Sequence, residues 1–198
     1  MIAILDYGSG NLRSAERAFA AAGVDVLVTR DAVVAAEAEG LVVPGVGAYA
    51  ACMNQLVAAG GDQIIKNRIA AGKKTLGICV GMQIFFETGT EKESATGLGL
   101  FAGAVTAIDN PVLPHIGWNT VVAGEGSTLF QGVENESFYF VHSYAAHQPV
   151  AGVINTFAEY GDRFLAAVET DLVSTTQFHP EKSGAAGARL IKNWVESL

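Results

Sequence analysis

The chain has 198 residues, of which half are hydrophobic, and a formal net charge of −8 at pH 7. A chain of this length can bury a full hydrophobic core, and we expect one domain over residues 1–198. Its 12 Lys and Arg residues are scattered, which argues against nucleic acid and against an anionic membrane surface as partners. The apolar segments are too short for a membrane span, and the N-terminus does not resemble a signal peptide. Together with the use of only two cysteines, these features predict a cytoplasmic protein with reduced thiols.

Short apolar segments alternate with helical patterns in the first half of the chain, which is typical of an α/β fold with a mainly parallel sheet. We expect strands at residues 1–5, 24–29, 41–43 and 75–78, and helices at about 11–23, 47–58, 62–71 and 80–88. From about 103 to 178 the pattern changes to β-rich segments, and a last helix is expected from about 184. The sequence therefore predicts a central, mainly parallel sheet flanked by helices, with a β-rich second half.

The segment LGICVGMQ, residues 76–83, predicts a strand that turns sharply into a helix at Cys79. Gly77 and Gly81 flank the cysteine as in a nucleophile elbow, where larger side chains at these two positions would collide. The helix dipole favours the nucleophilic thiolate of a cysteine at a helix N-terminus, so Cys79 is a candidate nucleophile. Cys52, on the apolar face of an expected helix, fits the commoner role of a buried structural cysteine.

A cysteine nucleophile needs a base, and the segment QFHPEKSG offers His179. Pro180 disfavours the helical region for the residue before it, which keeps His179 extended. Residues i and i+2 of an extended segment point to the same side, so Glu181 can reach the imidazole ring and fix its tautomer. The alternative is a polar surface turn. With the elbow present, a triad of Cys79, His179 and Glu181 is favoured.

The other three histidines are weaker candidates for the base. His142 ends an apolar strand, where a structural histidine is the better interpretation. His115 and His147 lie in turn-like segments beside prolines and have no obvious acidic partner.

The elbow GICVGMQ and the segment FHPEKS resemble the corresponding motifs of the class I glutamine amidotransferases. Five stretches resemble one branch of that family, the glutaminase subunits of imidazole glycerol phosphate synthases: DYGSGNLRS (6–14), PGVGAY (44–49), PHIGWN (114–119), YFVHSY (139–144) and FHPEKSG (178–184). The resemblance extends over the whole chain, and no proposed catalytic position departs from the family pattern.

This resemblance implies a flavodoxin-like fold, hydrolysis of glutamine to glutamate and ammonia, and no metal or cofactor. It also implies a heterodimer with a barrel-shaped cyclase subunit, to which the ammonia is channelled. The cyclase would convert a formimino-carboxamide ribotide to imidazole glycerol phosphate and an aminoimidazole carboxamide ribotide, as part of histidine biosynthesis.

Roles outside the triad also follow from the resemblance and from the elbow geometry. The oxyanion hole would be formed by backbone at Val80, Val46 and Gly47. The amino-acid end of glutamine would be held by Gln83 and Glu91 and by backbone at Gly45, Ser143 and Tyr144. The partner interface would include Asn11, Trp118, Tyr139 and Lys182.

The segment PGVG, residues 44–47, ends a buried strand and carries no charge. Because Gly45 and Gly47 tolerate positive φ, the peptides on either side of Val46 are expected to rotate. One orientation would aim the Val46 N–H at the oxyanion, and the other would aim a carbonyl there. We expect the isolated chain to prefer the second orientation and cyclase binding to favour the first, which is a two-state allosteric switch. The alternative is a tight turn with no switch.

Two other classes of function stay open from the sequence. One is an interaction protein with an inactive amidotransferase fold, although none of the three triad residues is missing. The other is a cysteine peptidase or thiol hydrolase on a similar scaffold, which would not require PGVG together with PHIGWN.

Overall fold

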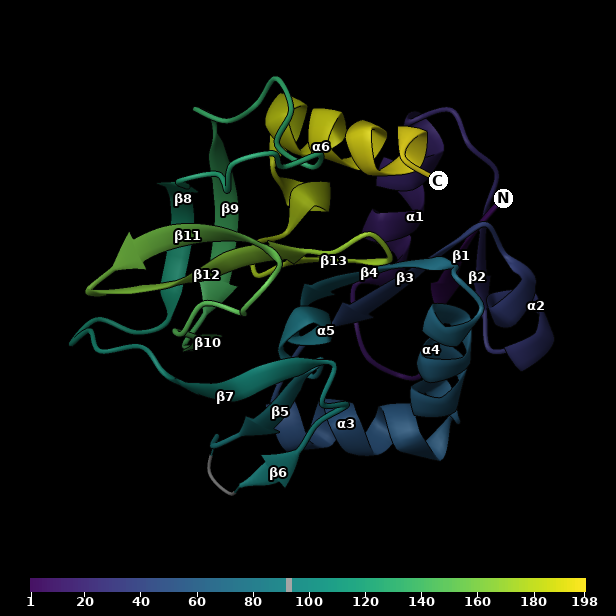
Figure 1. The fold of residues 1–198 in the computed structure, drawn as a ribbon, viewed down its shortest axis with the longest axis horizontal. Coiled ribbons are helices and arrows are strands. Elements are labelled where there is room, and N and C mark those ends of the chain that lie inside the picture. The colour runs from purple at the N-terminus through teal and green to yellow at the C-terminus, as the bar shows by residue number, and fades with distance from the viewer. Residues whose placement is uncertain (92–93) are drawn as a thin grey trace.

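A seven-stranded sheet runs through the molecule, with its strands in the order β11-β12-β13-β4-β3-β1-β2 (Figure 1). The structure is a computed structural model and describes residues 1–91 and 94–198. The strands of the large sheet are β1 (Ile2–Leu5), β2 (Val26–Thr29), β3 (Gly40–Gly45), β4 (Lys74–Cys79), β11 (Ile154–Tyr160), β12 (Asp162–Glu169) and β13 (Val173–Thr176).

The strands from β13 to β2 are parallel to one another, whereas β12 and β11 continue the sheet in antiparallel pairing. Numbered along the chain, the parallel strands have the order 2-1-3-4-5, which is the flavodoxin-like doubly wound order. Strands β1 and β3 are buried along their whole length, as expected for central strands covered on both faces. The predicted fold class is therefore confirmed.

Helices cover both faces of the large sheet. They are α1 (Leu12–Ala21), α2 (Ala32–Glu37), α3 (Tyr49–Ala58), α4 (Gly61–Ala70), α5 (Val80–Gln83), the 3₁₀ helix η1 (Pro180–Lys182) and α6 (Gly184–Glu196). α1 and α6 pack together on one face, and α4 packs against α2 and α3 on the other (Figure 1). The ring of Trp194 in α6 meets that of Phe19 in α1 edge-on, with both side chains buried. Among the described residues, no helix combines the length and apolar character needed to cross a membrane.

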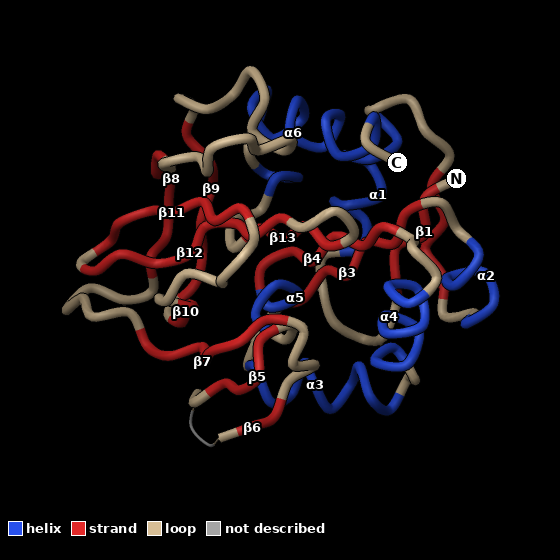
Figure 2. The backbone as a smooth tube through the Cα atoms, in the orientation of Figure 1, coloured by secondary structure: helices blue, strands red, loops and turns tan. Residues whose placement is uncertain are grey.

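The chain between β4 and β11 forms two smaller sheets. One has the order β10-β7-β5-β6, and the other pairs β8 with β9. Their strands are β5 (Phe86–Gly89), β6 (Ala95–Thr96), β7 (Phe101–Ala107), β8 (His115–Thr120), β9 (Ser137–His142) and β10 (Tyr144–Ala146). Figure 2 shows these strands gathered on the left and lower side of the view, away from the N-terminus. The predicted β-rich second half is therefore present.

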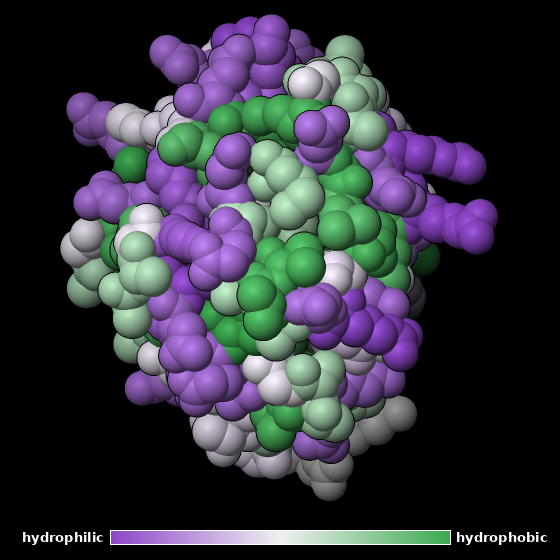
Figure 3. Space-filling model, turned by 90° about the vertical axis from the view of Figure 1, so that its right-hand side faces the viewer, coloured by the Kyte–Doolittle hydropathy of each residue, from purple (hydrophilic) through white to green (hydrophobic). Residues whose placement is uncertain are grey.

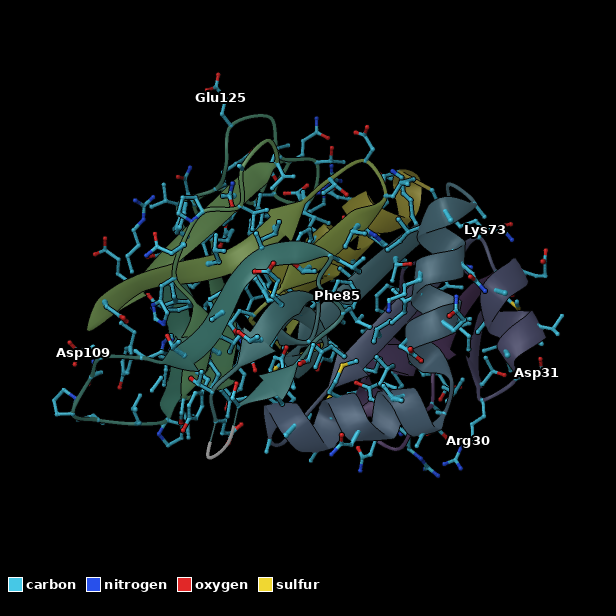
Figure 4. The ribbon with its side chains drawn as sticks, turned by 60° about the horizontal axis from the view of Figure 1, so that its bottom comes forward. Arg30, Asp31, Lys73, Phe85, Asp109 and Glu125 are labelled. Carbon is cyan, nitrogen blue, oxygen red and sulfur yellow. The ribbon has the colours of Figure 1, made fainter. Side chains whose placement is uncertain are left out.

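The helix expected at residues 80–88 is only one turn long, so that prediction was wrong in its extent. After α5 the chain enters β5, where Phe86 pairs with Phe101 of β7. Phe85 lies in the interior of the molecule (Figure 4). Because every residue from the start of α5 to Phe86 is buried, this segment has no solvent face, and pairing with β7 overrides the helical pattern.

The short helix α2 was not predicted. Asp31 caps it by accepting hydrogen bonds at Oδ1 from the N–H groups of Val33 (2.8 Å) and Val34 (3.1 Å). Six residues are too few for a helical period to be recognised in the sequence. The side of the molecule that carries α2 faces the viewer in Figure 3, where apolar patches lie between polar ones.

Candidate active site

Cys79 joins β4 to α5 through a strained turn. Its φ is +58° and its ψ is −115°, and no other non-glycine residue in the described part of the chain has a positive φ. Such backbone is typical of a nucleophile elbow. A Cβ at Gly77 would lie 2.6 Å from the carbonyl oxygen of Gly81, and a Cβ at Gly81 would overlap the carbonyl oxygen of Val43. The expected steric reason for glycine on both sides of Cys79 is therefore confirmed.

His179 follows β13, whose parallel pairing with β4 brings the histidine to the same end of the sheet as Cys79. Its backbone is extended, with φ −100° and ψ +96°, as Pro180 predicts. The Nδ1 atom of His179 lies 2.7 Å from Oε1 of Glu181, and both side chains are buried. The expected contact is present, but Glu181 lies in η1 rather than in an extended segment, because Pro180 begins a 3₁₀ turn.

Ser183 links the loop that contains His179 to strand β9. Its hydroxyl donates to the carbonyl oxygen of His179 at 2.7 Å and accepts from the N–H of Tyr139 at 2.9 Å. The N–H of His179 donates in turn to the carbonyl oxygen of Tyr139 at 2.9 Å. These three bonds hold the imidazole at a fixed place beside the elbow.

Opposing effects act on the protonation of the His179 ring. Burial disfavours the charged ring, but hydrogen bonds with Cys79 and Glu181 outweigh burial and raise the pKa of His179 to about 10. The ring is therefore protonated at neutral pH, with Nδ1 donating to Glu181 and Nε2 facing the sulfur. An imidazolium beside a cysteine favours the nucleophilic thiolate.

A cavity of about 530 Å³ opens over Cys79 and His179 at the carboxyl ends of β3 and β4, where doubly wound sheets bind ligands. Its walls include most residues expected in the site: Val46, Gly47, Val80, Gln83, Glu91, Ser143, Tyr144 and Lys182. Glu181 lies behind His179, and Gly45 lies beneath the start of α5. Within the described residues, no three His, Cys, Asp or Glu side chains are placed to hold a metal ion.

The protein itself limits how Gln83 and Glu91 can bind a ligand. The Nε2 atom of Gln83 donates to the carbonyl oxygen of Tyr144 at 2.8 Å and to Oε1 of Gln177 at 3.0 Å, which leaves only Oε1 of Gln83 for a ligand. Glu91 Oε2 accepts from the N–H of Tyr49 at the start of α3 at 3.0 Å. The oxygens left over are acceptors, so they suit an ammonium group rather than a carboxylate.

The PGVG segment, residues 44–47, rests on the segment that follows β1. The Tyr7 hydroxyl donates to the carbonyl oxygen of Pro44. Ser9 Oγ accepts from the N–H of Val46 and donates to its carbonyl oxygen, both at 3.0 Å. In this structure the Val46 N–H is therefore directed at Ser9.

The two glycines of PGVG serve different purposes. Gly47 has a φ of +85° and open space around its missing Cβ, so its backbone conformation requires glycine. A Cβ at Gly45 would overlap the backbone nitrogen of Gly81 and would lie 3.0 Å from Cys52 Sγ. Gly45 is therefore also needed because two backbones approach closely, a steric role that the sequence did not predict.

Three of the four residues expected at the partner interface lie together on the surface. Trp118 of β8 is 59 % exposed, and its ring meets that of Tyr139 on β9 edge-on at 6.1 Å between centroids. The Lys182 Nζ lies 6.0 Å from the centre of the Tyr139 ring. Asn11 caps α1, where its side chain accepts from the N–H of Ser14 at 3.4 Å.

The remaining histidines and Cys52 have local partners. His142 Nε2 lies 3.1 Å from His115 Nδ1, and His115 lies in β8 rather than in a turn. The expectation that His147 lacks an acidic partner was wrong, because its Nδ1 lies 3.1 Å from Oδ2 of Asp162. Cys52 is buried as predicted, and burial raises the pKa of its thiol to about 11.

Four residues that shape the site received no role from the sequence: Tyr7, Ser9, Gln177 and Ser183. All four lie inside the quoted motifs or beside them, so the motifs marked their neighbourhood. Their partners are far away in the sequence, and no spacing rule connects Ser9 to Val46 or Gln177 to Gln83.

The sheet order, the elbow and the His179–Glu181 contact define an amidotransferase-type site, and comparison with known proteins agrees. Residues 3–198 match the family described as glutamine amidotransferase class-I, and the chain belongs to that family. One solved structure described as a glutamine amidotransferase has a TM-score of 0.79 at 18 % identity, covering 99 % of this chain and 97 % of that one. The structure of PurLQS from Thermotoga maritima has a TM-score of 0.71 at 19 % identity, covering 99 % of this chain and 95 % of the matched one. At such identity these two structures support the fold alone.

Curated relatives identify the branch within this family. The chain is 56 % identical to the imidazole glycerol phosphate synthase subunit HisH of Nocardia farcinica and 54 % identical to that of Leifsonia xyli, over the whole chain and 98 % of each relative. The HisH protein of Streptomyces coelicolor is 50 % identical, over the whole chain and 93 % of the relative. Within the class I amidotransferases, the chain is thus one of the HisH proteins, the glutaminase subunits of imidazole glycerol phosphate synthase.

We expect Glu181→Gln to lower the pKa of His179, because the carboxylate stabilises the imidazolium. The pKa of His179 is raised to about 10 in the folded chain, above an unfolded value of about 6.5. Its contribution to stability is therefore complete below about pH 6.5 and is lost as the pH rises toward about 10. NMR titration of the ring, with urea unfolding across this pH range, measures both effects. An unchanged pKa would contradict the assignment, and Glu136→Gln, at an exposed position, is the control.

Proposed function

We propose that the chain hydrolyses glutamine with a triad of Cys79, His179 and Glu181 and passes the ammonia to a cyclase subunit. The observation that carries this proposal is the elbow cysteine facing a buried His179–Glu181 pair, joined at 2.7 Å, on the wall of one cavity. The cyclase would use the ammonia to make imidazole glycerol phosphate and an aminoimidazole carboxamide ribotide, products that the family resemblance implies.

The reaction follows from the positions of these groups. The Cys79 thiolate attacks the side-chain amide carbon of glutamine, and the carbonyl oxygen takes up the negative charge. His179 gives its Nε2 proton to the departing ammonia, which leaves a glutamyl thioester on the sulfur. The neutral ring then takes a proton from water as water attacks the thioester, and glutamate is released. Glu181 keeps the ring in the orientation that both steps need.

The amino-acid end of glutamine would lie toward Gln83 and Glu91. The free Oε1 atoms of these residues would accept hydrogen bonds from the α-ammonium group. Backbone at Ser143 and Tyr144 lines the same cavity and would bind the α-carboxylate through N–H groups. The carbonyl oxygens of Ser143 and Tyr144 accept from Ile108 N–H and from Gln83, so they are directed at protein donors.

Replacing Cys79 by alanine in the complex with the cyclase should abolish glutamine-dependent synthesis and leave ammonium-dependent synthesis unchanged. The reason is that the sulfur is needed only for release of ammonia. Product formation is measured with glutamine and with ammonium chloride as alternative nitrogen sources. Cys52→Ser is the matched control: it should keep both activities and lower only the free energy of unfolding. Equal loss of both activities in Cys79→Ala would contradict the division of labour.

The oxyanion hole would use the Val80 N–H and, after rotation of the Gly45–Val46 peptide, the Val46 N–H. In this structure Ser9 holds the Val46 N–H and thereby favours the orientation that does not offer it to the substrate. Gly45, at one end of this peptide, has the conformational freedom that rotation needs, and Gly47 already has a φ of +85° in this structure. Loss of one oxyanion donor costs about 10²–10³ in rate. The free chain is therefore proposed to be a slow glutaminase that the cyclase activates.

We expect Ser9→Ala to raise the glutaminase turnover of the free chain about fivefold. One internal hydrogen bond contributes about 1 kcal/mol, and its loss makes rotation of the Val46 peptide easier by that amount. Glutamate release from the free chain measures the effect, with Ser14→Ala on α1 as the control. If the unmodified free chain already runs at the rate of the complex, or if Ser9→Ala is no faster, the proposed switch is refuted.

The cyclase is proposed to dock on the surface of Trp118, Tyr139 and Lys182, with Asn11 at its margin. Lys182 belongs both to this surface and to the cavity wall, so a partner seated here would cover the mouth of the site. In the described residues Lys182 makes no salt bridge, which leaves its ammonium free for a partner carboxylate. Covering the mouth would let ammonia reach the cyclase without crossing bulk water.

Trp118→Glu should weaken binding of the cyclase about 30-fold or more, because truncated or charged aromatic anchors at an interface typically cost at least about 2 kcal/mol. Titration calorimetry with the purified subunits gives the affinity. Val33→Glu is the control, since Val33 is also exposed but lies on α2, on the side away from β8. If Val33→Glu weakens binding and Trp118→Glu leaves the affinity unchanged, the cyclase binds on the other side of the molecule and the proposal is wrong.

A further inference from the structure

A second buried side chain reaches the nucleophile besides His179. Gln177 follows β13 and is fully buried. Its Nε2 atom lies 3.9 Å from Cys79 Sγ, within the range of a hydrogen bond to sulfur, and its Oε1 accepts from Gln83 Nε2 at 3.0 Å. The triad chemistry makes no use of this amide.

The orientation of the Gln177 amide follows from its neighbours. The carbonyl oxygen of Tyr144 can only accept, so the Gln83 atom 2.8 Å from it is the NH₂ group. The same NH₂ group faces Gln177, which must therefore present its oxygen to Gln83. The NH₂ group of Gln177 is then the one that faces Cys79. The opposite orientation would bring two NH₂ groups together and aim an oxygen at the sulfur.

A buried histidine also bonds the Tyr144 carbonyl oxygen, and a second buried histidine bonds the first. His142 Nδ1 lies 3.0 Å from that oxygen, and His142 Nε2 lies 3.1 Å from His115 Nδ1. Burial lowers the pKa of His142 to about 3 and also lowers that of His115, so both rings are neutral at pH 7. Neutral His142 donates at Nδ1 and accepts at Nε2 from His115. The donors and acceptors are thus mutually consistent from His115 as far as Cys79.

We propose that Gln177 is a further catalytic residue, whose Nε2–H donates to the Cys79 sulfur, stabilises its thiolate and fixes its direction of attack. The proposal rests on the proposed glutaminase function and deepens it. Gln83 positions Gln177 by donating from Nε2 to the Oε1 atom of Gln177, and the Tyr144 carbonyl positions Gln83. The sulfur would then be held between a cation, His179, and a neutral donor, Gln177.

The size of the expected effect follows from the charge on the acceptor. Hydrogen bonds to charged groups are worth more than bonds between neutral groups, and loss of one such bond should disfavour the Cys79 thiolate about tenfold. The titratable groups that act on the sulfur or line its cavity are His179, with Glu181 behind it, Cys52, Tyr7, Glu91, His142 and Lys182. Substitution of Gln177 leaves these groups unchanged relative to the shared parent chain, so the effect reports on the amide.

The test uses two variants in a Cys52→Ala background, so that iodoacetamide can react with Cys79 alone. Gln177→Met keeps the length of the side chain but removes both its donor and its acceptor for Gln83, which the Tyr144 carbonyl still holds. Gln177→Glu keeps an acceptor for Gln83 but places an oxygen at the sulfur. We expect the pH midpoint of alkylation to rise by about one unit in Gln177→Met and by more in Gln177→Glu. In the complex with the cyclase, the kcat for glutamine should fall about tenfold with little change in KM.

An unchanged alkylation midpoint and kcat in a folded Gln177→Met variant would overturn the proposal and leave Gln177 a packing residue. If Gln177→Met fails to fold, Gln177→Glu decides by the same two readouts. Gln63→Met, at an exposed position of α4, is the matched control and should change neither. Alkylation needs no glutamine, so a complex without glutaminase activity would refute the proposed function while the thiol measurement still decides on Gln177.

Discussion

The site depends on the close approach of three backbone segments at Gly45, Gly77 and Gly81. A methyl group at Gly45 would overlap the backbone of Gly81, and one at Gly81 would overlap the backbone of Val43. This packing presses the first turn of α5 against the ends of β3 and β4 and forces Cys79 into a positive φ. The same contact sets the PGVG segment beside the sulfur. Strain at Cys79 and placement of the adjacent loop are therefore two results of one steric constraint.

Around this rigid centre, hydrogen bonds rather than ion pairs orient the polar groups. Apart from the His179–Glu181 pair and the side chains of Glu91 and Lys182 on the cavity wall, the polar groups around the site are hydroxyl, amide and neutral imidazole groups, such as Ser9, Gln177 and His142. Neutral groups of this kind are less costly to bury than charges, and each has a partner that fixes its direction. The groups that orient the buried part of the site are therefore mostly uncharged, and the His179–Glu181 pair is the buried ion pair among them.

The parts of the site that were predicted from the sequence are those in which the cause is local. Gly77 and Gly81 flank Cys79, and Pro180 lies between His179 and Glu181, so adjacent residues carried the argument. Gln177 and Ser9 were missed because their partners are joined to them only by the tertiary fold. The length of α5 was mispredicted for a related reason: Phe85 and Phe86 are buried on all sides, so hydrophobicity alone did not distinguish a helix from a strand.

The pairing of β4 with β13 has a consequence for a chain still on the ribosome. Cys79 and His179 are 100 residues apart in the sequence, and only this parallel pairing brings them to one edge of the sheet. A nascent chain that already contains β4 and the elbow has neither the imidazole nor Gln177 until almost all of the protein has been translated. Under the proposed mechanism, incomplete chains and fragments truncated before β13 would therefore carry Cys79 without His179 and would not consume glutamine.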